Sequence, residues 1–261
     1  MYDFEFVKPA SVADALAALN DEDAKPLSGG QTLLPTMKQR LAMPTKLVSL
    51  AGMAELIGVS AEGGVLTVKG ATPHAKVAVE ATAYPALAAL ASHIGDPAVR
   101  NRGTIGGSLA NNDPSACYPA AALASGATIV TNAREIPADE YFQGMFTTAL
   151  EEHEIITAVK FPIPEAANYQ KFVQPASRFA LVGVFVAKYA TGVRVAVTGA
   201  SEEGVFRWTE AEEALSASFT PEAVAGLKAS AEGLIGDIHG TPEYRAHLIG
   251  VMTKRAVAAA A

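Results

Sequence analysis

Two short glycine turns carry residue types that could bind an anion. The first is Ser28-Gly-Gly-Gln-Thr-Leu-Leu-Pro35 and the second is Thr104-Ile-Gly-Gly-Ser-Leu-Ala-Asn111. A Gly-Gly step allows a turn with positive φ and removes the Cβ atoms that would keep a ligand at a distance. Peptide N–H groups can then point into one concavity, which favours an anion, especially beside a helix N-terminus. Two turns of similar build predict a ligand with two adjacent phosphates, held from both sides.

Each turn taken alone is a weak signal. Neither fits the G-x-G-x-x-G pattern, and no Walker A sequence is present. Gly63-Gly64 has the same dipeptide in a segment that is typical of a hairpin, where a plain turn is the better interpretation. Arg100 and Arg102 precede the second turn and could pair either with phosphate or with acidic neighbours.

The residues offer no catalytic constellation of their own. There is no G-x-S-x-G elbow, and no carboxylate pair stands out. The single cysteine, Cys117, excludes an internal disulfide, a cysteine-ligated iron–sulfur cluster and a Cys₄ zinc site, and the five histidines are scattered. These absences fit a protein that holds a reactive cofactor and leaves the chemistry to it.

Composition limits the class of protein. The chain has 261 residues, half of them apolar and 18% charged, which is ordinary for an enzyme-like globular protein with a sizeable core. The net charge of −7 argues against nucleic-acid binding and offers no basic face to a membrane. No run approaches the ~18 apolar residues of a membrane span, and the acidic N-terminus is unlike a signal peptide. We therefore expect a cytoplasmic protein.

The first fifty residues read as β-α-β-α-β. Strands are expected at residues 4–7, 24–27 and 46–50, and helices at a capping-box-like start on Ser11 and over residues 32–40. The first glycine turn then lies at a corner between a strand and a helix. That is the context in which an anion site forms.

The rest of the chain predicts two further units. The first is expected to hold a hairpin of strands 57–59 and 66–68, helices over 75–82, 85–93 and 119–125, and strands at 128–130 and 155–161. Pro162 and Pro164 mark a plausible boundary. The last unit is expected to hold a three-stranded antiparallel sheet (169–173, 181–189, 192–198), then helices starting near Thr209, Thr220 and Thr241.

Longer segments carry a family resemblance. They are 9–12, 28–35, 95–114, 154–162, 242–245 and 252–255, of which Gly95-Asp-Pro-Ala-Val-Arg-Asn-Arg-Gly-Thr-Ile-Gly-Gly-Ser-Leu-Ala-Asn-Asn-Asp-Pro114 is the most specific. Across essentially its whole length the chain resembles the FAD-binding medium subunit of molybdenum hydroxylases. This family includes aerobic carbon monoxide dehydrogenase and xanthine dehydrogenase, and its flavin fold also occurs in vanillyl-alcohol-oxidase-type enzymes.

The resemblance implies an α+β fold in three parts. Residues 1–54 would form a small βαβ subdomain and residues 55–164 a larger mixed α/β subdomain. Together they would make a two-part FAD-binding module of the PCMH type. Residues 165–261 would form the C-terminal α+β domain.

The resemblance also implies which residues hold FAD. Residues 29–34 and 104–108 would hold the pyrophosphate, and Asp113 would lie by the adenosine or ribityl part. Ile156 matches a position near the adenine or flavin, Lys171 a lysine near the cofactor, and Phe179 a tyrosine beside the isoalloxazine ring. The full expected set is Ser28, Gly29, Gly30, Gln31, Thr32, Leu33, Leu34, Thr104, Ile105, Gly106, Gly107, Ser108, Asn111, Asp113, Cys117, Ile156, Lys171 and Phe179.

The residues alone leave other interpretations open. Lys171 could simply extend to solvent from a strand, and Phe179 is more typical of a core aromatic. Cys117 is typical of a small buried hydrophobe, and His93 of a partly buried packing residue. Asn111 and Asp113 also fit an ordinary turn. Relatives usually carry an aspartate at the position of Cys117, and a thiol replaces the hydrogen bonds of a carboxylate poorly.

The resemblance further implies partner chains. A large subunit would carry the molybdenum cofactor and a small subunit two [2Fe–2S] clusters, in a dimer of heterotrimers. Electrons would pass from the clusters through FAD on this chain to NAD⁺, a quinone or oxygen. Two competing functions remain open: a free-standing flavin oxidoreductase with a base such as His93 or Tyr189, and a non-catalytic nucleotide-binding module.

Overall fold

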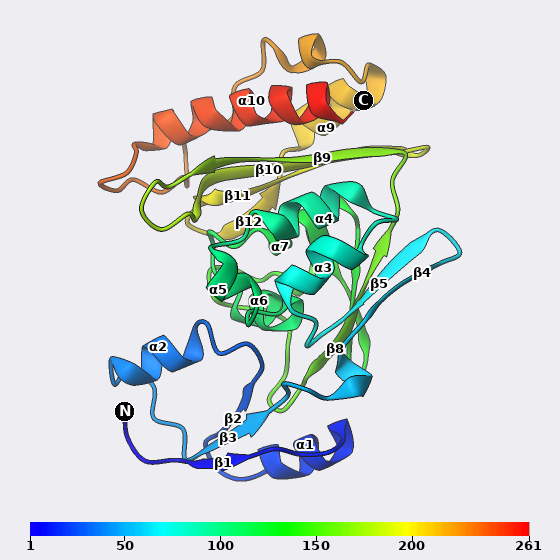
Figure 1. Cartoon of the computed structure of the whole chain (residues 1–261). Coiled ribbons are helices and arrows are strands. Elements are labelled where there is room, and N and C mark those ends of the chain that lie inside the picture. The colour runs from blue at the N-terminus through cyan, green and yellow to red at the C-terminus, as the bar shows by residue number, and fades with distance from the viewer. Residues whose placement is uncertain (261) are drawn as a thin grey trace.

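Three β-sheets follow one another along the chain and are stacked from its N-terminal to its C-terminal part (Figure 1). The computed structural model describes residues 1–260. The strand orders are β1-β3-β2, β4-β5-β8-β6-β7 and β12-β11-β10-β9. Most of the short helices lie beside the middle sheet, and the long C-terminal helix lies across the last one (Figure 1).

The N-terminal unit has the predicted β-α-β-α-β order. Its elements are β1 (Glu5–Val7), α1 (Val12–Leu19), β2 (Ala24–Leu27), α2 (Leu33–Lys38), β3 (Lys46–Ser49) and the 3₁₀ turn η1 (Ala54–Leu56). All three strands are parallel. The Ser11 hydroxyl accepts the Asp14 N–H at 3.1 Å and begins α1, as the sequence predicted. The first glycine turn therefore lies between the end of β2 and the start of α2.

The middle unit is an antiparallel sheet flanked by helices. Its strands are β4 (Val59–Glu62), β5 (Val65–Lys69), β6 (Thr128–Thr131), β7 (Glu135–Pro137) and β8 (Ile156–Pro162). Its helices are α3 (His74–Glu80), α4 (Pro85–Ser92), α5 (Pro97–Arg100), α6 (Ile105–Asn111), α7 (Tyr118–Ala124) and α8 (Ala138–Tyr141). The predicted elements are present, whereas β7, α5 and α8 are too short to show any periodicity in the sequence.

The C-terminal sheet has four strands, so the prediction of three was wrong. Its strands are β9 (Ala166–Val173), β10 (Ala180–Tyr189), β11 (Gly192–Ser201) and β12 (Gly204–Arg207). The extra strand, β12, is only four residues long and pairs with β11 across a register shift. Such a short edge strand carries too little alternation to be recognised. The following helices are α9 (Thr209–Ala217), the 3₁₀ turn η2 (Pro221–Val224) and α10 (Pro242–Ala259).

A buried arginine joins α10 to the last sheet. The Arg245 side chain is almost fully buried, and its Nη1 donates to the carbonyl oxygens of Leu181 and Gly199, both at 2.8 Å. Its Nη2 donates to Asp237 Oδ2 at 2.8 Å. A buried charge is costly unless it is paired. These bonds therefore fix α10 against the start of β10 and the end of β11.

Close backbone contact holds α6 against the end of β5. The Gly70 N–H donates to the Thr157 carbonyl and the Gly106 N–H donates to the Gly70 carbonyl, both at 2.8 Å. A Cβ atom on Gly106 would lie 2.6 Å from the Gly70 oxygen, and one on Gly70 would clash with the Ile156 carbonyl. The second glycine turn thus packs directly against the C-terminal end of β5, an inner strand of the middle sheet. Among residues 1–260, no helix is long and apolar enough to cross a membrane.

Candidate functional site: a cavity between the two glycine turns

A cavity of about 740 Å³ lies where the two glycine turns face each other. Most of its walls come from four segments that are distant in sequence, within residues 25–36, 94–117, 150–156 and 171–179, and Leu50, Gly70 and His74 complete the lining. Cofactor sites are typically clefts of about 300–1,000 Å³ with a few converging polar groups. The cavity therefore has the size of a cofactor site.

The first turn presents unused backbone donors to this cavity. Gly30 has φ +70°, in the left-handed region that favours glycine. Within residues 1–260, none of the N–H groups of residues 29–32 donates to a protein acceptor. Successive free N–H groups around a left-handed residue form a concavity suited to an anion. The first turn thus has the free donors that an anion site needs.

The second turn is built differently. The N–H groups of Ile105 and Gly106 donate to the carbonyls of Thr72 and Gly70, at 3.3 and 2.8 Å. The Gly107 N–H donates to Thr104 Oγ1 at 3.2 Å. These three donors already support the fold, so the second turn mainly contributes its side-chain hydroxyls and a close-fitting backbone. The sequence predicted that both turns would hold the ligand in the same way, but only the first turn has free N–H groups for it.

The two turns are in direct contact. Ser28 Oγ and Thr104 Oγ1 are hydrogen-bonded at 2.8 Å. A Cβ atom on Gly29 would lie 2.6 Å from Gly103 Cα and would clash with the Arg102 carbonyl. Because both neighbours are backbone atoms, only glycine at position 29 allows this approach. The cavity therefore depends on the absence of a side chain at Gly29.

All but two of the predicted residues line the cavity. Leu34 and Ile105 do not, although both belong to the glycine turns, and Ile105 is fully buried in the core. Ser108, Asn111, Asp113, Cys117 and Ile156 line it together with the residues of the first turn.

The β9–β10 hairpin closes the far side. Lys171 and Phe179 line the cavity, and Lys171 Nζ donates to the His93 carbonyl at 3.1 Å. Phe179 is 50% exposed, so its interpretation as a core aromatic was wrong. His93 is exposed and does not pack in the interior. Cys117 is buried, as expected of a small apolar side chain.

Arg100, a candidate phosphate ligand, has a structural task. Its Nη1 donates to the carbonyls of Ile94 and Gly95, both at 3.0 Å, and so shapes the loop between α4 and α5. Arg178, which the sequence analysis did not consider, lines the cavity from the β9–β10 hairpin. No local motif marks it, because only the return of β9 and β10 brings it to this place.

His74 is a second cavity residue that sequence reasoning missed. It lies beside the second turn because its N–H donates to the Gly103 carbonyl at 2.9 Å. Burial, with a smaller contribution from the Arg100 charge, lowers the pKa of His74 to about 4. The side chain is therefore neutral at neutral pH, and within the described chain its Nδ1 is buried without a hydrogen-bond partner.

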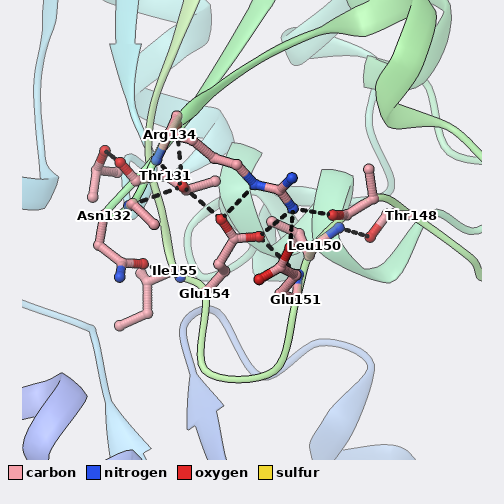
Figure 2. Close-up of polar contacts among 11 residues, drawn as sticks. Thr131, Asn132, Arg134, Thr148, Leu150, Glu151, Glu154 and Ile155 are labelled. Carbon is pink, nitrogen blue, oxygen red and sulfur yellow. Dashed lines mark hydrogen bonds and ion pairs between the residues drawn. The ribbon is translucent and has the colours of Figure 1, made fainter.

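A polar cluster supports the loop of residues 149–155, which precedes β8 and forms part of the cavity wall (Figure 2). Glu154 accepts two hydrogen bonds from Arg134, Nε to Oε1 and Nη2 to Oε2, both at 3.0 Å. The hydrogen bonds from Arg134 hold the pKa of Glu154 below its usual value. The carboxylate is thus ionised and compensated at neutral pH. Leu150, Glu154 and Ile155 from this loop all line the cavity.

Comparisons with known proteins identify the family. A family described as "FAD binding domain in molybdopterin dehydrogenase" matches residues 2–164. The chain belongs to this family of FAD-binding medium subunits of molybdenum hydroxylases. It is therefore a subunit of an oxidoreductase of the kind that includes carbon monoxide dehydrogenase and xanthine dehydrogenase.

Relatives match along nearly the whole chain. The nicotine 6-hydroxylase medium subunit of Paenarthrobacter nicotinovorans is 36% identical, over 97% of this chain and 95% of the relative. The carbon monoxide dehydrogenase medium chain of Hydrogenophaga pseudoflava is 33% identical, over 98% and 96%. A chain of quinoline 2-oxidoreductase from Pseudomonas putida 86 superimposes with a TM-score of 0.89 at 30% identity, over 99% and 97%. The α+β fold of this medium-subunit family thus extends through the C-terminal sheet.

We predict that His74 makes the protein acid-sensitive. Unfolded His74 binds a proton below pH ~6.5, whereas the folded side chain stays neutral down to about pH 4, so stability falls as pH falls through this range. At pH 5 this costs about 2 kcal/mol relative to pH 7.5. Urea unfolding should show that His74→Gln loses about 2 kcal/mol less than the unmodified chain on acidification. The exposed His93→Gln is the control, and an equal pH dependence in all three proteins would refute the assignment.

Proposed function

We propose that this chain binds FAD in the cavity and passes electrons through it within a molybdenum hydroxylase. The observation that carries the proposal is the row of free N–H groups at residues 29–32, which faces a cavity of cofactor size. The family match over residues 2–164 supports the same ligand. We further propose that residues 1–54 and 55–164 act together as the FAD-binding module and that residues 165–261 form the C-terminal domain.

The first turn would hold the diphosphate. Its N–H groups would donate to the anion, and the joined hydroxyls of Ser28 and Thr104 line the same cavity. Lys25, Lys171 and Arg178 line the same cavity and supply positive charge in a chain with a net charge of −7. Local charge of this kind is what a diphosphate requires when the overall field is unfavourable.

Other residues would hold the sugar and the rings. Asp113 Oδ1 accepts the Ser115 N–H at 2.8 Å, which orients the carboxylate and leaves Oδ2 for a ribose or ribityl hydroxyl. Leu150 and Ile156 provide an apolar wall, and Phe179 provides an aromatic face at the hairpin. When bound, FAD supplies the electron uptake and release, and the protein's task is to position and tune it.

The positions of the candidate bases argue against a free-standing flavin oxidoreductase. His93 and Tyr189 do not line the cavity, and the Tyr189 hydroxyl donates to the Pro162 carbonyl at 3.0 Å. His74 does line it, but a buried imidazole with a pKa of about 4 is a poor base at neutral pH. Electron transfer requires no such base on this chain.

The names of the relatives support partner chains, because they describe medium subunits and medium chains. We propose a small subunit with two [2Fe–2S] clusters as electron donor and a large subunit with the molybdenum cofactor as the place of substrate oxidation. The complex would be a dimer of heterotrimers. The external acceptor would be NAD⁺, a quinone or oxygen.

We expect the chain to co-purify with these partners from its native source. An affinity-tagged chain should bring down two further polypeptides together with molybdenum, iron and flavin. Metal analysis and intact mass spectrometry of the complex measure this directly. Recovery of the tagged chain with FAD alone would instead support the free-standing flavin oxidoreductase.

We expect Gly29→Ala to abolish FAD binding, since its methyl group would push the two turns apart. The purified chain should be yellow or become so when incubated with FAD, and fluorescence titration should give a Kd at least about a hundredfold higher for the variant. Gly226→Ala is the matched control, because Gly226 is exposed, has open space around the added methyl group and does not adopt a positive φ. A chain that stays colourless with excess FAD would support a non-flavin nucleotide-binding module.

We expect Cys117→Asp to tighten FAD binding about tenfold. The Tyr169 hydroxyl is buried next to Cys117 and donates no hydrogen bond in the described chain, since a thiol is a weak acceptor. An aspartate at position 117 would accept a hydrogen bond from this hydroxyl and would also face the cavity. A hydrogen bond to a charged group contributes about 1.5–3 kcal/mol. FAD occupancy after purification, with Cys117→Ser as the control, measures the change, and unchanged occupancy would contradict the expectation.

A further inference from the structure

We infer that Arg134 is a positioning residue of the cofactor cavity, although it does not line the cavity. It acts through Glu154 on the loop of residues 149–155, which forms one wall. This inference rests on the proposed function, because it concerns how tightly FAD is held.

The Arg134 guanidinium holds both ends of this loop. At the C-terminal end it makes the two-fold hydrogen bond to the Glu154 carboxylate, and at the N-terminal end Nη2 donates to the Ala149 carbonyl at 2.6 Å. Figure 2 shows the Arg134 side chain with its guanidinium group directed at the Glu154 carboxylate. A planar guanidinium fixes direction as well as distance in such a pair. The loop is therefore closed by one side chain from outside it.

The Glu154 carboxylate is fully used within this cluster. Its Oε1 also accepts the Thr131 hydroxyl at 3.0 Å, and its Oε2 also accepts the Glu151 N–H at 2.7 Å. Its side chain is only 5% exposed. Glu154 therefore borders the cavity without offering a free negative charge to it. Without Arg134, an uncompensated carboxylate would face the place proposed for a dianionic ligand, where like charges repel.

The turn that carries Arg134 is itself well fixed. The Ile155 N–H donates to Asn132 Oδ1 at 2.7 Å, and the Asn132 N–H donates to the Ile155 carbonyl at 3.1 Å. Thr131 Oγ1 accepts the N–H groups of Ala133 and Arg134 at 3.1 and 2.9 Å. The turn between β6 and β7 is thus a rigid support from which Arg134 sets the position of Leu150, Glu154 and Ile155.

A neighbouring ion pair gives a matched control. Lys160 on β8 pairs with Glu135 on β7, with side chains that are 41% and 55% exposed. Neither residue lines the cavity. Exposed pairs of this kind contribute little to stability. Lys160→Gln therefore removes a positive charge from the same sheet without touching the loop.

The experiment compares FAD binding by Arg134→Gln, Glu154→Gln, the double variant and Lys160→Gln. We expect Arg134→Gln and Glu154→Gln to raise the FAD Kd at least fivefold and to alter the visible circular dichroism of the bound flavin. The double variant should be no weaker than the weaker single variant, because both changes break the same pair. Arg134→Lys keeps the positive charge but cannot make the two parallel hydrogen bonds to Glu154, so it should retain more of the affinity than Arg134→Gln. Lys160→Gln should match the unmodified chain.

The thermal midpoint of the FAD-free proteins separates positioning from general stability. An unmodified Kd and flavin spectrum in Arg134→Gln, even with a lowered midpoint, would overturn the inference and leave Arg134 a structural residue only. If Arg134→Gln does not fold, an Arg134→Lys variant with unmodified affinity and spectrum would overturn it equally. Failure of the unmodified chain to bind FAD would overturn the proposed function itself, and that result is distinguishable because it precedes any substitution.

Discussion

The contact between the two glycine turns is the constraint on which the rest of the site depends. Gly29 lies against the backbone of Arg102 and Gly103, and the Ser28 and Thr104 hydroxyls join across this contact. The hydrophobic cluster of the N-terminal parallel sheet extends to Ala71 and Ile155 of the middle unit. The relative placement of the two units at the cavity is therefore set by this apolar contact together with the polar, backbone-to-backbone contact of the two turns. A contact between backbone atoms tolerates almost no change in size, which makes it a precise spacer.

The two turns share a sequence pattern but serve different physical purposes. In the first, glycine frees N–H groups for a ligand, and in the second it allows α6 to begin directly against Gly70 at the end of β5. A Gly-Gly dipeptide indicates only that a Cβ atom would be unfavourable at these positions. Whether a ligand or another backbone takes the space is decided by the fold. The same caution applies to Gly63-Gly64, which has open space on every side.

Local patterns predicted those parts of the fold whose causes are local. The Ser11 cap, the β2–turn–α2 corner and the helix that follows Thr241 are each determined by neighbouring residues, and all three are present. The fourth strand of the last sheet was missed because β12 exists only through its pairing with β11. The interpretation of Phe179 as a core aromatic rested on how often phenylalanine is buried, and it was wrong because a hairpin end can hold an aromatic residue at a cavity instead of in the core.

The site residues that sequence reasoning missed are those that reach the cavity from distant parts of the chain. His74 reaches the cavity through a bridge from Pro73 to Thr104, and Arg134 reaches it through Glu154, twenty residues further along the chain. Neither lies in a motif, yet both determine the electrostatics of the wall: His74 stays neutral and Arg134 cancels a carboxylate. In an acidic chain, a cavity suits an anion better when ionisable groups at its border are neutral or paired, as His74 and Glu154 are here. The glycine turns supply donors for the ligand, and these distant residues limit the unpaired charge that borders it.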